Sequence, residues 1–288
     1  MKAYFISAVA LLLFLATSST AADLQQIRDF WFSGAEISRY ELSQSRYGER
    51  HQGHVEFIFV TEPFLTDRQV KHEYGSGKST DILKLNALRT FNTGIYSYRT
   101  MTSTFKPIDL EKYPHALKTN TSVQDWCGQA FQQINQIDEG WRVELRSYFQ
   151  GKGDQDTTLP SAWLEDELWL QVRLAPEQLP IGKFQCIPGA VATRFNHQEI
   201  AVFAATGSLR KKTNELIYSI NYPDLDRTLN IHFKAKFPHI ITAWSEVDAG
   251  GTTTATLKDR IMHSEYWSDN KPSDTDKRKE LGLDPIAN

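Results

Sequence analysis

The stretch at residues 229–237, LNIHFKAKF, alternates strictly between apolar and polar residues. Residues 141–149, WRVELRSYF, alternate in the same way over most of their length. A period of two places apolar side chains on one face of a strand and polar side chains on the other. One buried face and one solvated face are typical of antiparallel sheets, so both stretches predict strands of such a sheet.

Weaker alternation predicts more strands on both sides of these two. They are expected at about residues 37–43, 55–60, 82–88, 95–105, 216–222, 240–247 and 255–262. Glycines at positions 48, 53, 94, 250 and 251 fall between or beside these runs, where the chain must turn.

Two segments have helical spacing. Residues 23–32 predict a short amphipathic helix at the start of the mature chain, and residues 160–174 predict a longer helix in the middle of the chain. Pro160 suits a first helical turn, and the stripe Leu164, Leu168 and Val172 shares one helix face. The acidic trio 165–167 favours the N-terminal half and is expected on a solvated face, because adjacent helical residues do not form a facing carboxylate pair.

This order of elements predicts a mainly β protein with a minor α component. We expect one domain over residues 23–267, in which a large antiparallel twisted sheet or half-barrel wraps the helix near residues 160–174. No internal repeat or change in composition divides the chain. Residues 268–288 are charged and contain proline, so a loosely ordered C-terminal tail is expected there.

The first 22 residues have the pattern of a secretory signal peptide. Lys2 precedes an apolar run from Ala3 to Ala16, and residues 17–22 are small. This run is shorter than the roughly 20 residues that span a bilayer, so we expect cleavage after Ala22 or Ala21 rather than a membrane anchor. The mature chain is therefore predicted to be periplasmic or secreted, with no transmembrane segment.

Composition excludes several classes of protein. The 288 residues carry 32 Lys+Arg and 35 Asp+Glu, a net charge of −3, which leaves no basic surface for nucleic acid. A hydrophobic fraction of 40% is too high for a disordered chain. We expect a folded monomer with a substantial core.

Export gives the two cysteines, Cys127 and Cys186, two alternative states. In an oxidising compartment an isolated pair forms a disulfide, provided that the fold brings the two residues together. The other state is a pair of buried free thiols. The sequence leaves both open.

Recognisable catalytic motifs are absent. The string GSGKST at residues 75–80 resembles the end of a phosphate-binding loop, but His72 occupies the position of the first glycine. The pair His51 and His54 straddles Gly53 in an expected turn, without the helical context of a zinc site. The sequence predicts no catalytic residue, no metal site and no cofactor.

Aromatic residues are the remaining candidates for ligand contacts. Tyr96 and Tyr98 share one face of an expected strand, and Trp163 and Trp169 lie on the expected helix. Such side chains can line a sugar-stacking face or an apolar cavity. The alternative is ordinary packing in the core and sheet, where aromatics are also favoured.

Several strings together resemble an uncharacterised family of exported bacterial proteins, mainly from Bacteroidota. They are residues 30–37, 46–49, 59–62, 84–86, 91–96, 121–128 and 265–267, and the likeness covers nearly all of the mature chain. Members are sometimes labelled "septum formation inhibitor Maf", which implies nucleotide pyrophosphatase activity. Maf proteins open with a Ser-x-Ser-Pro-Arg-Arg type motif, which this sequence lacks. The family supplies no catalytic residues to assign.

These observations predict an exported, non-enzymatic envelope protein that binds an apolar or amphiphilic molecule. Its ligand is expected in a sizeable, mostly apolar cavity or groove between sheet and helix. One alternative is an exported hydrolase, with Cys127 or a carboxylate in hydrogen-bond reach of a histidine. Nucleotide pyrophosphatase activity, implied by the family label alone, is the other.

Overall fold

The alternating segments form the strands of one large curved sheet. The computed structural model describes residues 24–283, and the expected signal peptide therefore lies outside the described residues. The strands are β1 (Ala35–Arg46), β2 (Glu49–Leu65), β3 (Val70–Lys71), β4 (Ser79–Thr93), β5 (Tyr96–Pro107), β6 (Lys118–Asp125), β7 (Gly128–Ile137), β8 (Gly140–Ser147), β9 (Gln155–Pro160), β10 (Trp163–Leu164), β11 (Gly182–Ile187), β12 (Phe203–Lys212), β13 (Glu215–Tyr222), β14 (Arg227–Lys234), β15 (Ile241–Asp248) and β16 (Gly251–Ser264).

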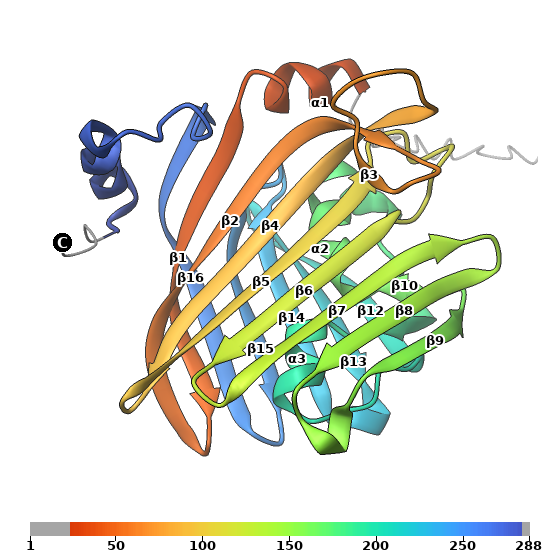
Figure 1. The fold of residues 1–288 in the computed structure, drawn as a ribbon, viewed down its shortest axis with the longest axis vertical. Coiled ribbons are helices and arrows are strands. Elements are labelled where there is room, and N and C mark those ends of the chain that lie inside the picture. Colours follow the sequence, from red (N-terminus) through yellow and green to blue (C-terminus); the bar gives the residue numbers. More distant parts are fainter. Residues whose placement is uncertain (1–23, 284–288) are drawn as a thin grey trace, which may run out of the picture.

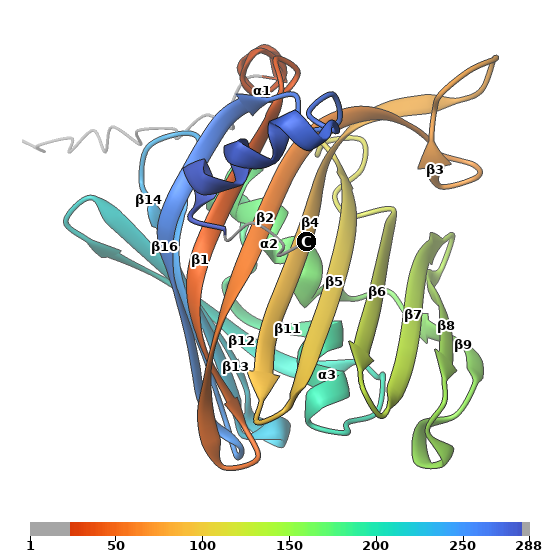
Figure 2. The same cartoon turned by 60° about the vertical axis from the view of Figure 1, so that its left-hand side comes forward.

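Helices account for a minor part of the described chain. The α-helices are α1 (Leu24–Trp31), α2 (Glu165–Leu174) and α3 (Ala190–Phe195). Short 3₁₀ helices are η1 (Gln150–Lys152), η2 (Pro176–Gln178), η3 (Pro223–Leu225) and the longer η4 (Pro272–Leu281). In Figures 1 and 2 the sheet curves around α2 and α3, as a half-open barrel does. The prediction of a mainly β fold with a large twisted antiparallel sheet is confirmed.

The two ends of the sheet are consecutive in the chain. The 16 strands run in the order β10-β11-β12-β13-β14-β15-β16-β1-β2-β4-β5-β6-β7-β8-β9, with β3 paired to β2. Only two residues separate β9, at one end of this order, from β10 at the other. The indole N–H of Trp141 in β8 donates to the Ala162 carbonyl at 2.9 Å, which holds this crossing against the sheet.

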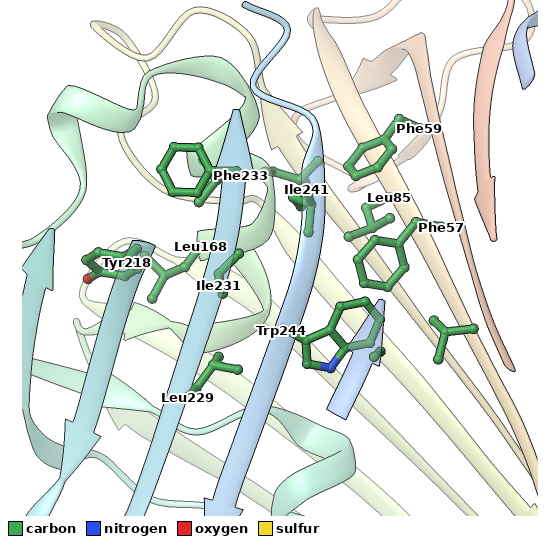
Figure 3. Packing of buried hydrophobic residues seen from close by; sticks show 14 of the residues in the cluster. Phe57, Phe59, Leu85, Leu168, Tyr218, Leu229, Ile231, Phe233, Ile241 and Trp244 are labelled. Carbon is green, nitrogen blue, oxygen red and sulfur yellow. The ribbon is translucent and has the colours of Figure 1, made fainter. Parts of the chain in front are cut away.

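The main core lies between the two walls of the curved sheet. Figure 3 shows Phe57 of β2 and Trp244 of β15 facing each other, and their rings stack with centroids 5.1 Å apart. Leu168 of α2, which is fully buried, lies in the same cluster. Each buried side chain of this size stabilises the fold by about 1.5–3 kcal/mol, so a cluster drawn from both walls and from α2 holds the walls together.

Three local predictions differ from the structure. Helix α2 begins at Glu165 rather than Pro160, because residues 155–160 form edge strand β9, where the missing N–H of a proline needs no partner. Strand β14 ends at Lys234, since the chain turns there and the Lys234 N–H donates to the Ile240 carbonyl. Gly53 lies inside β2 rather than in a turn.

The C-terminal segment is more ordered than expected over its described part. Residues 272–281 form η4, and Leu281 is buried. In Figure 2 this helix lies outside the sheet, across β16, β1 and β2. None of the helices in the described part of the chain is both long and apolar enough to cross a bilayer.

Candidate functional site

The space between the sheet and α2 is nearly filled. The cavity there measures about 60 Å³, room for only a few waters. Its walls include Glu165, Asp166, Arg227 and Glu246 beside Trp169. The prediction of a sizeable, mostly apolar cavity between sheet and helix is therefore wrong, because side chains of the helix itself occupy that space.

The acidic trio is part of this interior, and its prediction as a solvated face is wrong. Glu165 accepts two hydrogen bonds from Arg227, at 2.5 Å and 2.8 Å, and both side chains are buried. Glu167 accepts from Lys106 at 2.8 Å and lies 2.9 Å from His115 Nδ1. Burial alone would raise the pKa of Glu167, but Lys106 and His115 outweigh it and lower the pKa to about 2.

Asp166 connects the interior to helix α3. Burial and the neighbouring charge of Glu165 raise the pKa of Asp166 to about 7. Its Oδ2 accepts the N–H of Ala190, the first residue of α3, at 3.2 Å. The position of α3 is thus tied to a carboxyl group that titrates near neutral pH.

Two open pockets lie at the other end of α3. One pocket of about 340 Å³ is lined by residues from several hairpin ends and from α3, including Arg46, Tyr98, Cys127, Lys152 and Arg194. A second pocket, of about 640 Å³, shares Gly151, Lys152, Arg194 and His197 with the first. We call these adjoining pockets the hairpin-end groove. Its volume falls in the range of small-molecule sites.

Local turns place each side chain of the groove. Arg46 ends β1 just before a tight turn, in which Tyr47 has a φ of 55° and Gly48 a φ of 78°. Cys127 lies in the turn between β6 and β7, and Lys152 ends η1 between β8 and β9. These turns all lie at the lower end of the molecule in Figures 1 and 2, with α3 beside them. The groove is therefore built where antiparallel hairpins end.

Cations of the groove have no carboxylate partner. Within residues 24–283, no ion pair engages Arg46, Lys152 or Arg194, whereas the buried Arg173 and Arg227 are both paired. Arg46 donates to the Phe195 carbonyl at 2.6 Å, and the Nε atoms of Arg46 and Arg194 have no hydrogen-bond partner there. Unpaired guanidinium and ammonium groups favour an anionic ligand.

Burial first, and then the nearby cations, affect the protonation of His197. Partial desolvation and the charges of Arg194, Arg46 and Lys152 lower the pKa of His197. The imidazole therefore remains neutral at pH 7, where it can donate or accept a hydrogen bond.

Aromatic rings form the rest of the wall. The hydroxyls of Tyr47 and Tyr98 lie 2.7 Å apart, and the Tyr96 hydroxyl donates to that of Tyr47 at 3.2 Å. The guanidinium of Arg46 lies 4.6 Å from the Tyr47 ring centroid, and that of Arg194 lies 4.4 Å from the Phe149 centroid. Charge and apolar area thus occur side by side in the groove.

The four aromatic candidates separate into three places. Tyr98 lines the groove, and Tyr96 is hydrogen-bonded to its rim. Trp169 packs in the core against Phe57 and Trp244, with ring centroids 5.5 Å and 5.4 Å away. The ring centroids of Trp163 and His115 lie 4.7 Å apart, outside the groove. The two tryptophans are core residues rather than members of one site with the tyrosines.

Neither predicted state of the cysteines is correct. Cys127 and Cys186 are both free, but Cys127 is exposed and only Cys186 is buried. Cys186 lies in β11 on the inner face, where the Tyr222 hydroxyl donates to its sulfur at 3.1 Å. Cys127 occupies a hairpin tip, so the two residues do not meet.

The basic residues of the groove were not found from the sequence. Arg46, Lys152 and Arg194 are far apart in the chain and belong to no motif. Within the described chain, no cluster of three or more His, Cys, Asp or Glu residues is placed to hold a metal ion.

The described chain thus belongs to the class of curved, half-open antiparallel sheets that enclose a short helix. Comparison with protein-family models and with curated proteins gives no match. Among solved structures, the chain is similar to the beta-barrel-like protein of domain of unknown function DUF1849 from Brucella abortus. The TM-score is 0.51 at 10% identity, over 80% of this chain and 98% of that chain. At this identity the likeness concerns the fold alone.

Proposed function

We propose that this chain is an exported, non-enzymatic envelope protein that binds an anionic amphiphile in the hairpin-end groove. The observation that carries the proposal is the set of unpaired cations Arg46, Lys152 and Arg194, placed beside aromatic rings in two adjoining pockets of about 640 Å³ and 340 Å³. A carboxylate or phosphate head group is the chemistry that these cations complement.

The apolar part of the groove favours a ligand with a hydrocarbon portion. Leu145, Leu159 and Ile200 line the second pocket, and Tyr47 and Phe149 line the first. An inorganic anion would leave these side chains in contact with water only. An amphiphile places its head group among the cations and its chain along the apolar wall.

Fluorescence titration with dansyl-undecanoic acid and its uncharged methyl ester tests the proposal. We expect the acid to bind with the higher affinity. The double variant Lys152→Gln and Arg194→Gln removes two charges that hold no ion pair in the fold. It should weaken binding of the acid by at least about tenfold, the effect of one charge-assisted hydrogen bond. Binding of the ester should remain unchanged.

Lys211→Gln is the matched control, because Lys211 is exposed in β12 and makes no ion pair within the described chain. Its affinity for the acid should equal that of the wild type. Equal affinity for acid and ester, or an unchanged affinity in the double variant, would contradict the proposal.

One observation favours the hydrolase alternative: Cys127 and His197 line the same pocket. No hydrogen bond joins the Cys127 thiol to a histidine in the described residues, and the buried Glu167–His115 pair lies outside the groove. Because Cys127 is exposed, its labelling by a thiol-directed probe would not by itself indicate a hydrolase. A hydrolase should cleave ester substrates and lose that activity in Cys127→Ser, whereas a binding protein should show no such activity. Release of pyrophosphate from nucleoside triphosphates is the corresponding test of the pyrophosphatase alternative.

A further inference from the structure

Large apolar side chains are exposed at the tips of neighbouring hairpins. Tyr47 between β1 and β2 is 63% exposed, and Ile95 between β4 and β5 is 83% exposed. Trp126 between β6 and β7 is 70% exposed, and Tyr148 after β8 is 77% exposed. These hairpins are adjacent in the sheet and end on the same side of the molecule (Figures 1 and 2). We call these four residues the tip rim.

Contacts join the tips into one surface. Tyr47 is hydrogen-bonded to Tyr96 and Tyr98 of the next hairpin. The Tyr148 ring lies so close to Gly128, in the β6–β7 hairpin, that a Cβ there would come within 2.8 Å of it. These contacts join the first two tips to each other and the last two to each other, and the pairing of β5 with β6 connects the two pairs.

On the same side of the molecule, the hairpins of the opposite wall, formed by β13 to β16, have different tips. The turn between β13 and β14 carries Asp224 and Asp226, and Asp248 precedes the turn between β15 and β16. No aromatic residue is exposed in these two turns of the described chain. In these turns the exposed large apolar residue is Val247, beside the β15–β16 turn and 41% exposed, so the exposed aromatic tips belong to the wall that borders the groove.

We propose that the tip rim docks on the surface of an anionic lipid bilayer and inserts Ile95, Trp126 and Tyr148 into its interface. Trp and Tyr are enriched at membrane–water interfaces, where an apolar ring and a polar atom are both accommodated. Anionic head groups complement the unpaired Arg46, Lys152 and Arg194 immediately behind the rim. The groove is also lined by the acidic residues Asp125, Asp154, Asp156 and Glu199. Asp125 accepts the N–H groups of Cys127 and Gly128, Asp154 accepts that of Ser147, and Asp156 pairs with Arg146.

Docking in this orientation would open the groove directly onto the bilayer. The inference rests on the exposed tips and not on the identity of the groove's ligand. Its test measures association with membranes rather than binding of a soluble amphiphile, so either proposal can fail without the other.

Co-sedimentation with vesicles of phosphatidylglycerol and phosphatidylethanolamine tests the inference. The wild-type protein should sediment with these vesicles and much less with vesicles of phosphatidylcholine alone. Half-maximal sedimentation of the double variant Ile95→Ser and Trp126→Ser should require at least about tenfold more lipid than that of the wild type. The reason is that each substitution removes an apolar side chain from the interface.

The control variant carries Tyr74→Ser and Trp267→Ser, which alter aromatics exposed by 88% and 50% away from the tip rim. It should sediment as the wild type does. The inference is wrong if the wild type does not sediment, if the tip variant sediments equally well, or if the control loses as much. It is also wrong if the tip variant instead abolishes a concentration-dependent dimer, since the tips would then contact a second copy of the chain.

Discussion

Lys106 Nζ lies 2.8 Å from Oε2 of Glu167, and neither side chain is exposed to solvent. Lys106 belongs to β5 and Glu167 to α2, so this pair fixes the helix to one wall of the sheet. The same carboxylate accepts the backbone N–H groups of Ala116 and Leu164. A charge buried this deeply is stable only because each of its lone pairs has a partner.

Two more ion pairs fix α2 to other strands. Arg227 of β14 holds Glu165 at the start of the helix, and Arg173 at its end donates two hydrogen bonds to Glu36 of β1. Hydrophobic packing alone would allow the helix to slide or rotate in the half-barrel. Three separate pairs specify one position, and with it the position of α3 and the groove.

Removal of one partner of the Lys106–Glu167 pair should be strongly destabilising. Lys106→Met leaves the Glu167 carboxylate buried without its lysine partner, and we expect a loss of about 3–5 kcal/mol in the free energy of unfolding. Urea denaturation followed by tryptophan fluorescence measures it. Adding Glu167→Gln should recover part of the loss, because it removes the uncompensated charge.

Lys258→Met is the control for that variant. Lys258 pairs with Glu41 on the surface, with both side chains more than half exposed. Such pairs contribute about 1 kcal/mol or less. An equal loss in both variants would mean that the buried pair does not position α2.

Asp166 should make the free energy of unfolding fall as the pH rises from about 4 to about 7. Its pKa is about 7 in the folded protein, raised by burial and by Glu165 from an ordinary value of 3.8. Between these two values the native state binds the proton and the unfolded state does not. The stabilisation is therefore complete below about pH 4 and lost as the pH approaches about 7. Asp166→Asn should be more stable than wild type at about pH 8, with less difference at about pH 5.

Glu56, on the outer face of β2, is the comparison residue for Asp166. Burial raises the pKa of Glu56 to about 7 as well. Glu56→Gln should reduce the same pH dependence. Only Asp166→Asn should also alter binding of dansyl-undecanoic acid, because only Asp166 holds the first residue of α3. Identical binding in both variants would separate Asp166 from the groove.

The sequence predicted the strands in which alternation is strong, and the physical reason is burial on one face. Residues 141–147 of the predicted run 141–149 lie in β8 with Trp141, Val143 and Leu145 buried, in agreement with the pattern. Strand β7 was missed, because its Gln132 and Asn135 are polar yet buried. A polar residue facing the interior is indistinguishable in the sequence from one facing solvent.

The acidic trio shows the same limit more clearly. Three consecutive carboxylates predict a solvated surface, since burial of an unpaired charge is costly. The pattern cannot reveal that Lys106, 61 residues earlier, and Arg227, 62 residues later, reach the same helix. Long-range pairing of this kind is decided by the topology of the sheet. For the same reason the sequence offered Tyr96 and Tyr98 as candidates but not the cations that lie near them.

Gly53→Ala should be destabilising although Gly53 lies in a regular strand. A Cβ at this position would come within 2.2 Å of the Thr90 carbonyl oxygen in β4. The strands must separate locally to relieve that overlap, and we expect a loss of about 1–3 kcal/mol in thermal or urea denaturation. Gly151→Ala meets no atom within 4 Å and should change stability by about 0.5 kcal/mol or less. Equal effects would show that β2 and β4 do not approach this closely.

Thiol labelling connects the cysteines to the groove. Iodoacetamide should modify only Cys127 in the folded protein, because Cys186 is fully buried and burial raises the pKa of its thiol. Mass spectrometry should find one adduct under native conditions and two in urea. Cys127 lines the pocket that also contains Lys152 and Arg194. Saturating dansyl-undecanoic acid should therefore slow the labelling of Cys127 in the wild type. In the double variant Lys152→Gln and Arg194→Gln, the same concentration of the acid should protect Cys127 far less. If neither cysteine is labelled in urea, the two form a disulfide. If the acid does not change the rate of labelling of Cys127, the acid binds outside the groove.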